Sequence, residues 1–233
     1  YPLPKCDHVA LPDFSSGAME NWGLITYREI ALIADPNTIS TSTKEMVATV
    51  IAHEISHQWF GNLVTMRWWD DLWLNESFAN FMEYFAIDAI YPEWNVMLTF
   101  AAHEALQAFR RDVLPGVQSV ATTVHHPDEI SSLFDPSIVY AKGGRLLYMV
   151  YHIVGDRNFK KGLQYYFKKH AYSNTTGDDL WQALSKASGI DIASIMHTWI
   201  TQSGFPYVKI SPDTDTSVYV EQHQLSTMGS NEE

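Results

Sequence analysis

The sequence predicts an α+β fold that is mostly helical, with short strands near its two ends. Residues 1–40 are rich in proline, glycine and strand-forming side chains. From Ser42 onward the apolar residues follow a helical period, and after Gly204 they alternate instead. These three observations place the helices in the middle of the chain and the strands at either end.

The strand predictions rest on β-forming side chains between turn residues. The clearest candidate near the start covers residues 23–33, GLITYREIALI. Two further strands are expected at 205–210 and 218–225, separated by a turn that reads SPDTD.

The helix predictions rest on periodicity and on residues typical of helix ends. A Ser-x-x-Glu capping box at Ser42 begins the first helix, and Gly61 stops it. Thr176, three residues before an aspartate, and Asp191 resemble the N-terminal caps of two later helices. The expected helices are 42–60, 75–90, 94–112, 140–154, 157–170, 178–187 and 192–202.

The composition is typical of a soluble globular protein and argues against several classes. No run of about 18 apolar residues occurs, so no membrane segment is expected. The net charge of −12 argues against a nucleic-acid partner, which requires a basic face. The single cysteine, Cys6, excludes an internal disulfide and a multi-cysteine zinc site. The start lacks a signal-peptide pattern, so a cytoplasmic location is expected.

The strongest chemical signal is the pentapeptide HEISH at 53–57, inside the first helix. His53 and His57 lie one turn apart on one helix face, separated by about 40°. Two imidazoles so placed can reach one tetrahedral ion, and Glu54, displaced to the side, can reach a water on that ion. The alternative is a pair of ordinary core or surface histidines beside a charged helical residue.

A third metal ligand is expected from the next helix. Glu76 lies 19 residues after His57 and begins that helix, which can fold antiparallel against the first. Ligating imidazoles usually donate their other N–H to a partner, and Asn75 and Asp71 are candidates for that role. Alternatively, Asp71 and the aspartate before it cap a helix.

Two other features are interpreted as structural. The sequence from His103 and Glu104 begins like the metal motif but lacks its second histidine, so we interpret it as an ordinary helix face. The three tryptophans near the turn between the helices, Trp68, Trp69 and Trp73, are expected in the core.

Three motifs in order resemble the zinc aminopeptidase family of the aminopeptidase N type, and its bacterial members most. They are GAMEN at 17–21, HEISHQWFGNLVT at 53–65 and WLNE at 73–76. The resemblance covers essentially the whole chain. It implies a gluzincin whose thermolysin-like catalytic domain occupies residues 1–204 and lacks its opening sheet. Residues 205–233 are then the start of a following β-sandwich domain, and further N- and C-terminal domains of the same parent chain are expected.

The resemblance also implies the roles of the metal-site residues. His53, His57 and Glu76 would bind one Zn²⁺ per chain, and Glu54 would be the general base that activates water. Tyr140, before Lys142 and a glycine, would stabilise the oxyanion. By itself, Tyr140 reads as an aromatic residue at a helix start.

The first motif is implied to bind substrate. Glu20 would bind the α-amine, Gly17 and Ala18 would run alongside the peptide, and Met19 would line the pocket for the first side chain. Asn21 is counted with these substrate-binding residues. Without the other motifs, the stretch reads as a turn entering a strand.

The implied activity is zinc-dependent hydrolysis of the N-terminal bond of peptides with a free N-terminus, which releases amino acids. The zinc helix alone also fits an endopeptidase, or a bifunctional gluzincin with epoxide hydrolase activity. A third alternative is a catalytically incomplete domain. An exopeptidase needs a fixed carboxylate for a cationic terminus, and Glu20 is the residue that distinguishes these alternatives.

Overall fold

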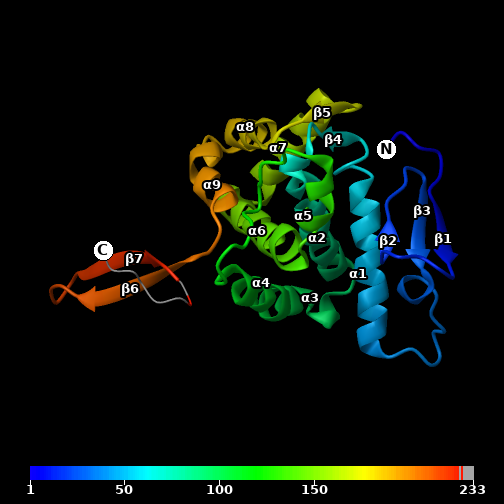
Figure 1. Ribbon diagram of the computed structural model, residues 1–233, viewed down its shortest axis with the longest axis horizontal. Helices are drawn as coiled ribbons and strands as arrows, with labels where there is room; N and C mark the ends of the chain where they lie inside the picture. Colours follow the sequence, from blue (N-terminus) through cyan, green and yellow to red (C-terminus); the bar gives the residue numbers. More distant parts are fainter. Residues whose placement is uncertain (226, 228–233) are drawn as a thin grey trace.

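The computed structural model describes residues 1–225 and 227. It confirms a mostly helical fold with small sheets, arranged as a helical body with one sheet beside α1 and a hairpin at the far end (Figure 1). The expected β-sandwich start at 205–233 falls partly on residues 226 and 228–233, which lie outside the described residues. The main elements are β1 (Asp7–Leu11), β2 (Ala18–Met19), β3 (Leu24–Arg28), α1 (Thr41–His57), β4 (Val64–Met66), α2 (Trp73–Ile90), α3 (Val96–Thr99), α4 (Ala105–Asp112), α5 (Ile130–Leu133), α6 (Gly143–Val154), α7 (Asp156–His170), β5 (Ser173–Thr175), α8 (Gly177–Ser188), α9 (Ile192–Thr201), β6 (Pro206–Pro212) and β7 (Val218–Gln224).

The N-terminal region forms a three-stranded sheet where the sequence predicted a single strand. Its order is β1-β3-β2, with β1 parallel and β2 antiparallel to β3. The predicted strand stops at Arg28, and the following residues form a 3-10 turn, Glu29–Ala31. Ala31 is buried with Ile25 and Tyr27. The turn therefore folds the chain back onto the sheet's apolar face, which local β propensity did not predict.

Helix α1 connects the sheet to the helical body. Its N-cap is Ser40, whose side chain accepts a hydrogen bond from the Thr43 amide, so the capping box predicted at Ser42 was wrong. Two partly buried residues of α1, Val50 and Ile51, pack against the sheet's core. In Figure 1 α1 stands between the sheet and the remaining helices.

Helix α2 lies at the centre of the helical core. Phe78 and Phe81 are fully buried on it, and the same core cluster includes residues of α6, α7, α8 and α9. Trp73 is 1% exposed and stacks on Trp181 of α8, as a core tryptophan should. Trp68 is 45% exposed, so its prediction as core was wrong. The central position of α2 is what allows its first turns to carry site residues on a rigid support.

Two predicted helices contain π-helical segments. The helix expected at 94–112 begins at Val96, after the left-handed Asn95, and the π-helical segment Phe100–Glu104 joins α3 to α4 within it. The segment Pro136–Lys142 precedes α6 and includes the position at which the helix was expected to begin. Such π-helical turns widen a helix and are frequent at functional sites.

The C-terminal third follows the predictions closely. The capping box at Thr176 with Asp179 and the cap at Asp191 are both present. The short strand β5, which was not predicted, pairs in parallel with β4, which falls within the extended piece expected at 62–66. Strands β6 and β7 form an antiparallel hairpin that extends from the body (Figure 1). Among the described residues no helix is long and apolar enough to cross a bilayer.

Candidate metal centre and active-site cleft

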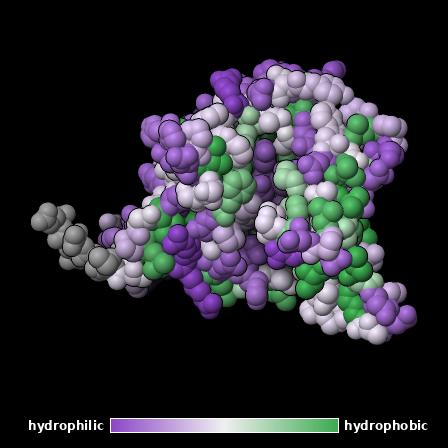
Figure 2. Space-filling model, turned by 45° about the vertical axis from the view of Figure 1, so that its right-hand side comes forward, coloured by the Kyte–Doolittle hydropathy of each residue, from purple (hydrophilic) through white to green (hydrophobic). Residues whose placement is uncertain are grey.

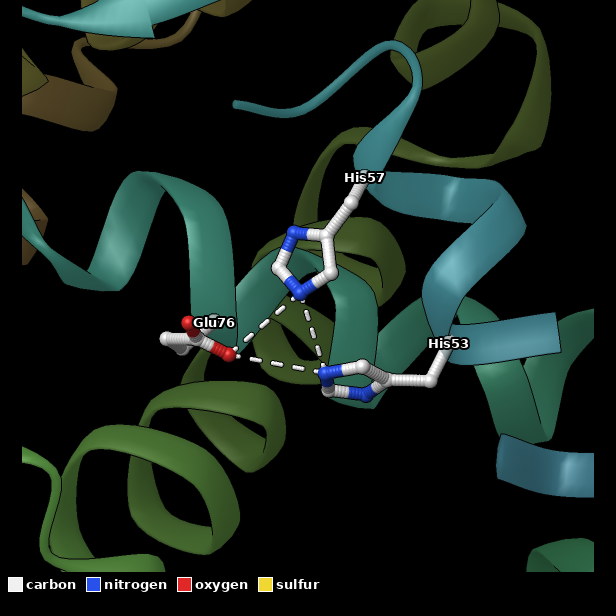
Figure 3. Close-up of side chains that lie close together, drawn as sticks. All are labelled: His53, His57 and Glu76. Atoms are coloured by element: carbon white, nitrogen blue, oxygen red, sulfur yellow. Dashed lines mark hydrogen bonds and ion pairs between the residues drawn. The ribbon is translucent and has the colours of Figure 1, made fainter. Parts of the chain in front are cut away.

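Three predicted ligands from α1 and α2 converge on one point (Figure 3). The Nε2 atoms of His53 and His57 are 3.1 Å apart, and the Glu76 Oε2 atom lies 3.4 Å from each. Glu76 and His57 are 6% and 1% exposed. The helices run antiparallel, because the end of α1 meets the start of α2 while Glu83, two turns later, meets His53.

The spacing of these atoms fits a tetrahedral zinc ion. Ligand bonds of about 2.0–2.1 Å at tetrahedral angles put ligand atoms about 3.3 Å apart. The observed separations of 3.1, 3.4 and 3.4 Å match this value. Two imidazole nitrogens and one carboxylate oxygen are also a donor set that zinc accepts, with a fourth position left for water or substrate.

The other ring nitrogens are held by partners that the sequence did not reveal. His53 Nδ1 lies 2.7 Å from Glu83 Oε2, and His57 Nδ1 lies 3.0 Å from the Phe60 carbonyl oxygen. Both acceptors favour the tautomer with a hydrogen on Nδ1, which leaves each Nε2 lone pair directed at the common point. The one available signal for Glu83 was its position seven residues after Glu76, on the same face of α2.

The partners proposed from sequence for the ligating histidines were wrong. Asp71 instead accepts hydrogen bonds from the Trp73 ring N–H and the Gly177 amide, and so ties α2 to α8. The Asn75 side chain lies beside Gly61, where a Cβ atom would come within 3.2 Å of it. Gly61 has a φ of 127°, so the turn after α1 favours glycine for its backbone conformation.

Glu54 is buried next to the ligands but is not one of them. It is 6% exposed and lines the cleft, and its Oε2 atom has no hydrogen-bond partner among the residues that the structure describes. Burial raises the pKa of Glu54 to about 7, although the positive charges of His53 and His57 oppose this shift. A buried carboxylate oxygen without a partner is costly, which marks Glu54 as a candidate for a functional role.

The charges of the ligand set reinforce one another. Burial alone would raise the pKa of Glu76, but when His53 and His57 are protonated their Nε2–H groups donate to it, and this outweighs burial and holds that pKa far below its usual value. Conversely, burial lowers the pKa of His53, and its bonds to Glu76 and Glu83 raise it overall. The site therefore favours a positive charge between the carboxylates, which is the charge that a bound cation provides.

Tyr140 reaches the same cleft from the π-helical segment Pro136–Lys142. Its ring stacks on His53 with centroids 6.0 Å apart, and burial, followed by the charge of Glu76, raises the pKa of its hydroxyl. The segment is held to α2 because Ser77 donates to the Val139 carbonyl at 2.5 Å. Lys142 anchors it from the other side through a buried ion pair. The hydroxyl of Tyr140 thus remains a neutral donor.

The GAMEN segment (residues 17–21) lies beside the C-terminal end of α1. Ala18 and Met19 form β2 and pair with β3, and Gly17 accepts from the Arg28 amide. Glu20 follows, with its Oε1 atom 3.9 Å from His57 Nδ1. The Asn21 side chain instead donates to the Met19 carbonyl and the Thr26 hydroxyl, and it does not line the cleft.

These residues surround one cleft of about 1340 Å³. It contains all the predicted metal and catalytic residues and the substrate-binding residues 17–20. The space-filling view shows the face of the protein hollowed near its middle, with hydrophilic residues inside (Figure 2). Glu104 also lines this cleft, in the π-helical segment Phe100–Glu104, and its interpretation as part of an ordinary helix face was wrong.

The comparisons with known proteins agree on one family. The model of the peptidase family M1 domain matches residues 1–199. Aminopeptidase N of Lactococcus lactis subsp. cremoris is 58% identical over 218 residues, which are 94% of this chain and 26% of that protein. Aminopeptidase N of Lactobacillus helveticus is 53% identical over 225 residues, 97% of this chain and 27% of that protein. The puromycin-sensitive aminopeptidase of Caenorhabditis elegans is 47% identical over 232 residues, 98% of this chain and 24% of that protein. The chain thus spans about a quarter of the length of these curated relatives.

Proposed function

The chain belongs to the peptidase M1 family, and we propose that it carries the catalytic centre of a zinc aminopeptidase. The substrates would be peptides with a free N-terminus, from which the first amino acid is released. Residues 1–204 would form a thermolysin-like catalytic domain, and residues 205–233 would begin a β-sandwich domain. The observation that carries the proposal is the position of a second, non-ligating carboxylate, Glu20, 3.9 Å from the ligand His57.

The metal of this proposal is one Zn²⁺ per chain, held by His53, His57 and Glu76. The spacing of their three ligand atoms supports zinc, as does the orientation of both rings by Nδ1 acceptors. When bound, zinc supplies Lewis-acid chemistry: it polarises the scissile carbonyl and makes water a better nucleophile at neutral pH.

Glu54 is proposed as the general base. Its buried carboxylate belongs to a residue that lines the same cleft as the ligands, and one of its oxygens makes no hydrogen bond within the described part of the chain, which supports a role in accepting a proton from water. Glu54 would take the proton of the attacking water and later give it to the nitrogen of the leaving amine. A fixed base that returns its proton contributes about 10²- to 10⁴-fold to the rate.

Tyr140 is proposed as an oxyanion donor. Its pKa is raised by burial, so its hydroxyl keeps its hydrogen and can donate to the oxygen that becomes negative as the carbonyl is attacked. Loss of one such preorganised donor raises the barrier by about 3 kcal/mol.

Glu20 is proposed to bind the substrate's α-ammonium group, which separates this proposal from an endopeptidase. A carboxylate next to the metal ligands recognises a cation one residue from the cleaved bond. Gly17 and Ala18 would pair with the extended peptide, because they offer small side chains beside a strand backbone. Met19 would line the pocket for the first side chain, and Asn21 would support this segment through its hydrogen bonds.

The test compares leucine p-nitroanilide with its N-acetylated form on the full-length, zinc-loaded protein. We expect the free amine to be preferred by at least about 100-fold in kcat/KM, since a buried charge-assisted bond is lost on acetylation. The preference should fall in Glu20→Gln while zinc content stays near one per chain. Equal cleavage of both substrates would contradict the proposal and favour an endopeptidase. Bound zinc without cleavage of either would favour a catalytically incomplete domain.

A further inference from the structure

The side chain of Gln58, directly after the ligand His57, makes hydrogen bonds through both its nitrogen and its oxygen. Its Nε2 atom donates to the Glu20 carbonyl at 3.1 Å and to the Glu54 carbonyl at 3.3 Å. Its Oε1 atom accepts from the Gly23 amide at 3.3 Å, while the Tyr1 hydroxyl donates to the backbone carbonyl of Gln58 at 2.8 Å. Gln58 is 3% exposed, so these bonds are made in a nearly dry environment, where an amide left unpaired is costly.

A second amide reaches the same carbonyl oxygen. Asn62 Nδ2 donates to the Glu20 carbonyl at 2.7 Å, from the turn that follows α1. Strand β2 ends at Met19, so Glu20 lies just beyond the ladder that pairs β2 with β3. The two side-chain amides therefore hold this residue where sheet pairing no longer does.

The consequence is a direct connection between three parts of the site. Gln58 and Asn62 follow the ligand His57 in sequence and bind the backbone of Glu20, whose carboxylate lies 3.9 Å from His57. Gln58 also binds the backbone of the proposed base, Glu54. The buried Gln58 amide is thus hydrogen-bonded to the backbones of both the proposed amine-binding residue, Glu20, and the proposed base, Glu54, next to the ligand His57.

We propose that Gln58 and Asn62 are positioning residues that set the distance from Glu20 to the metal ligands and so determine the preference for a free α-amine. This inference rests on the proposed function of Glu20. A carboxylate that binds the α-amine is selective only while it lies one residue's length from the cleaved bond. A misplacement of about 1 Å can lower the rate by up to about 100-fold. Just beyond the end of β2 at Met19, the Glu20 carbonyl is held by these two amides, the side-chain donors that reach it among the described residues.

The variants are Gln58→Met, which keeps the volume of the side chain, and Asn62→Ala. We expect each variant to lower the ratio of kcat/KM for free over acetylated leucine p-nitroanilide by about 10-fold. The change should come from a higher KM for the free amine. Cleavage of the acetylated substrate should change little. A change of fold stability alone would affect both substrates equally. Asn158→Ala is the matched control, because Asn158 Nδ2 also donates to a backbone carbonyl, that of Val154, away from the cleft.

A double-mutant cycle with Glu20→Gln decides whether the amides act through Glu20. If they do, Gln58→Met should have no further effect on the ratio in the Glu20→Gln background. A parallel calorimetric titration of the metal-free protein with leucinamide and N-acetyl-leucinamide gives a readout that is independent of turnover. We expect the variants to lose the selectivity for leucinamide that the unmodified protein shows.

The outcomes separate this inference from the proposed function. If Glu20→Gln leaves the free-amine preference intact, the amine-anchor role itself is wrong. If Glu20→Gln abolishes the preference but Gln58→Met and Asn62→Ala retain it, the positioning role is overturned and the proposed function stands. Additive effects in the cycle would likewise overturn it, because the amides would then act independently of Glu20.

Discussion

Replacement of Glu83 tests how the metal centre is oriented. Glu83 Oε2 lies 2.7 Å from His53 Nδ1, and both side chains are largely buried. Glu83→Leu would leave the ring N–H of His53 without an acceptor, at a cost of about 1–3 kcal/mol. Loss of such an outer partner weakens metal binding by about 10- to 100-fold, or about 1.4–2.8 kcal/mol at 1.4 kcal/mol per tenfold, so the two magnitudes agree.

Glu83→Gln should have a smaller effect, because the amide oxygen still accepts from the ring. A neutral hydrogen bond is about half as strong as a charge-assisted one, so we expect zinc to bind about 3- to 10-fold more weakly. The assay is competition for zinc with a chelator at one fixed pH, since protons compete with the metal for the same ligands. Thermal unfolding of the metal-free variants establishes that they are folded.

Glu104→Gln is the matched control, another carboxylate in the cleft that makes no hydrogen bond to a ligand among the described residues. Its zinc dissociation constant should stay within about threefold of the unmodified protein, as expected for a residue outside the ligands' hydrogen-bond partners. An unchanged zinc affinity in a folded Glu83→Leu variant would refute the orienting role of Glu83. If Glu83→Leu and Glu104→Gln lost equal amounts of zinc affinity, the weakening would be due to negative charge in the cleft and not to the hydrogen bond between Glu83 and His53.

Three further predictions concern the catalytic residues and their support. Glu54→Gln should retain one zinc per chain by metal analysis while kcat falls by about 10²- to 10⁴-fold, and substantial residual turnover would remove it from the role of base. Tyr140→Phe should lower kcat by about 10²-fold with little change in KM, and an unchanged kcat in the folded variant would contradict the oxyanion assignment. Lys142→Met breaks the buried ion pair with Asp112, whose partners are 2.8 Å apart and 7% and 4% exposed. It should lower the free energy of unfolding by about 3–5 kcal/mol in denaturant titrations, and a loss below about 1 kcal/mol would refute that estimate.

Local pattern was enough to predict the elements with strong periodicity. The helices that became α2, α7, α8 and α9 differ from their predicted bounds by two residues or fewer, because their apolar spacing and caps are properties of contiguous residues. The prediction of the first strands failed because these strands are defined by pairing with distant residues. Strand β1 is paired with β3, seventeen residues further along, and is exposed over much of its length, so little in its own sequence marks it. The capping error at Ser42 came from two serines separated by one residue, of which Ser40 has the extended backbone of a cap.

The sequence by itself determined where the candidate metal ligands would be. His53 and His57 share a face by the helical repeat alone, and Glu76 could reach them because a short connection favours an antiparallel helix. The assignments of Glu20 and Tyr140 came instead from resemblance, since nothing within either segment distinguishes it from a turn or a helix start.

Only the tertiary structure decided which groups orient and connect these residues. Glu83 as the partner of His53, the Phe60 carbonyl behind His57, and the Gln58 and Asn62 amides on the Glu20 carbonyl depend on which surfaces pack together. A helical period records the face on which a side chain lies, but not which distant segment will cover that face. That pairing is set by the burial of apolar surface across the whole fold, and it appears only once the sheet, α1 and α2 are in contact.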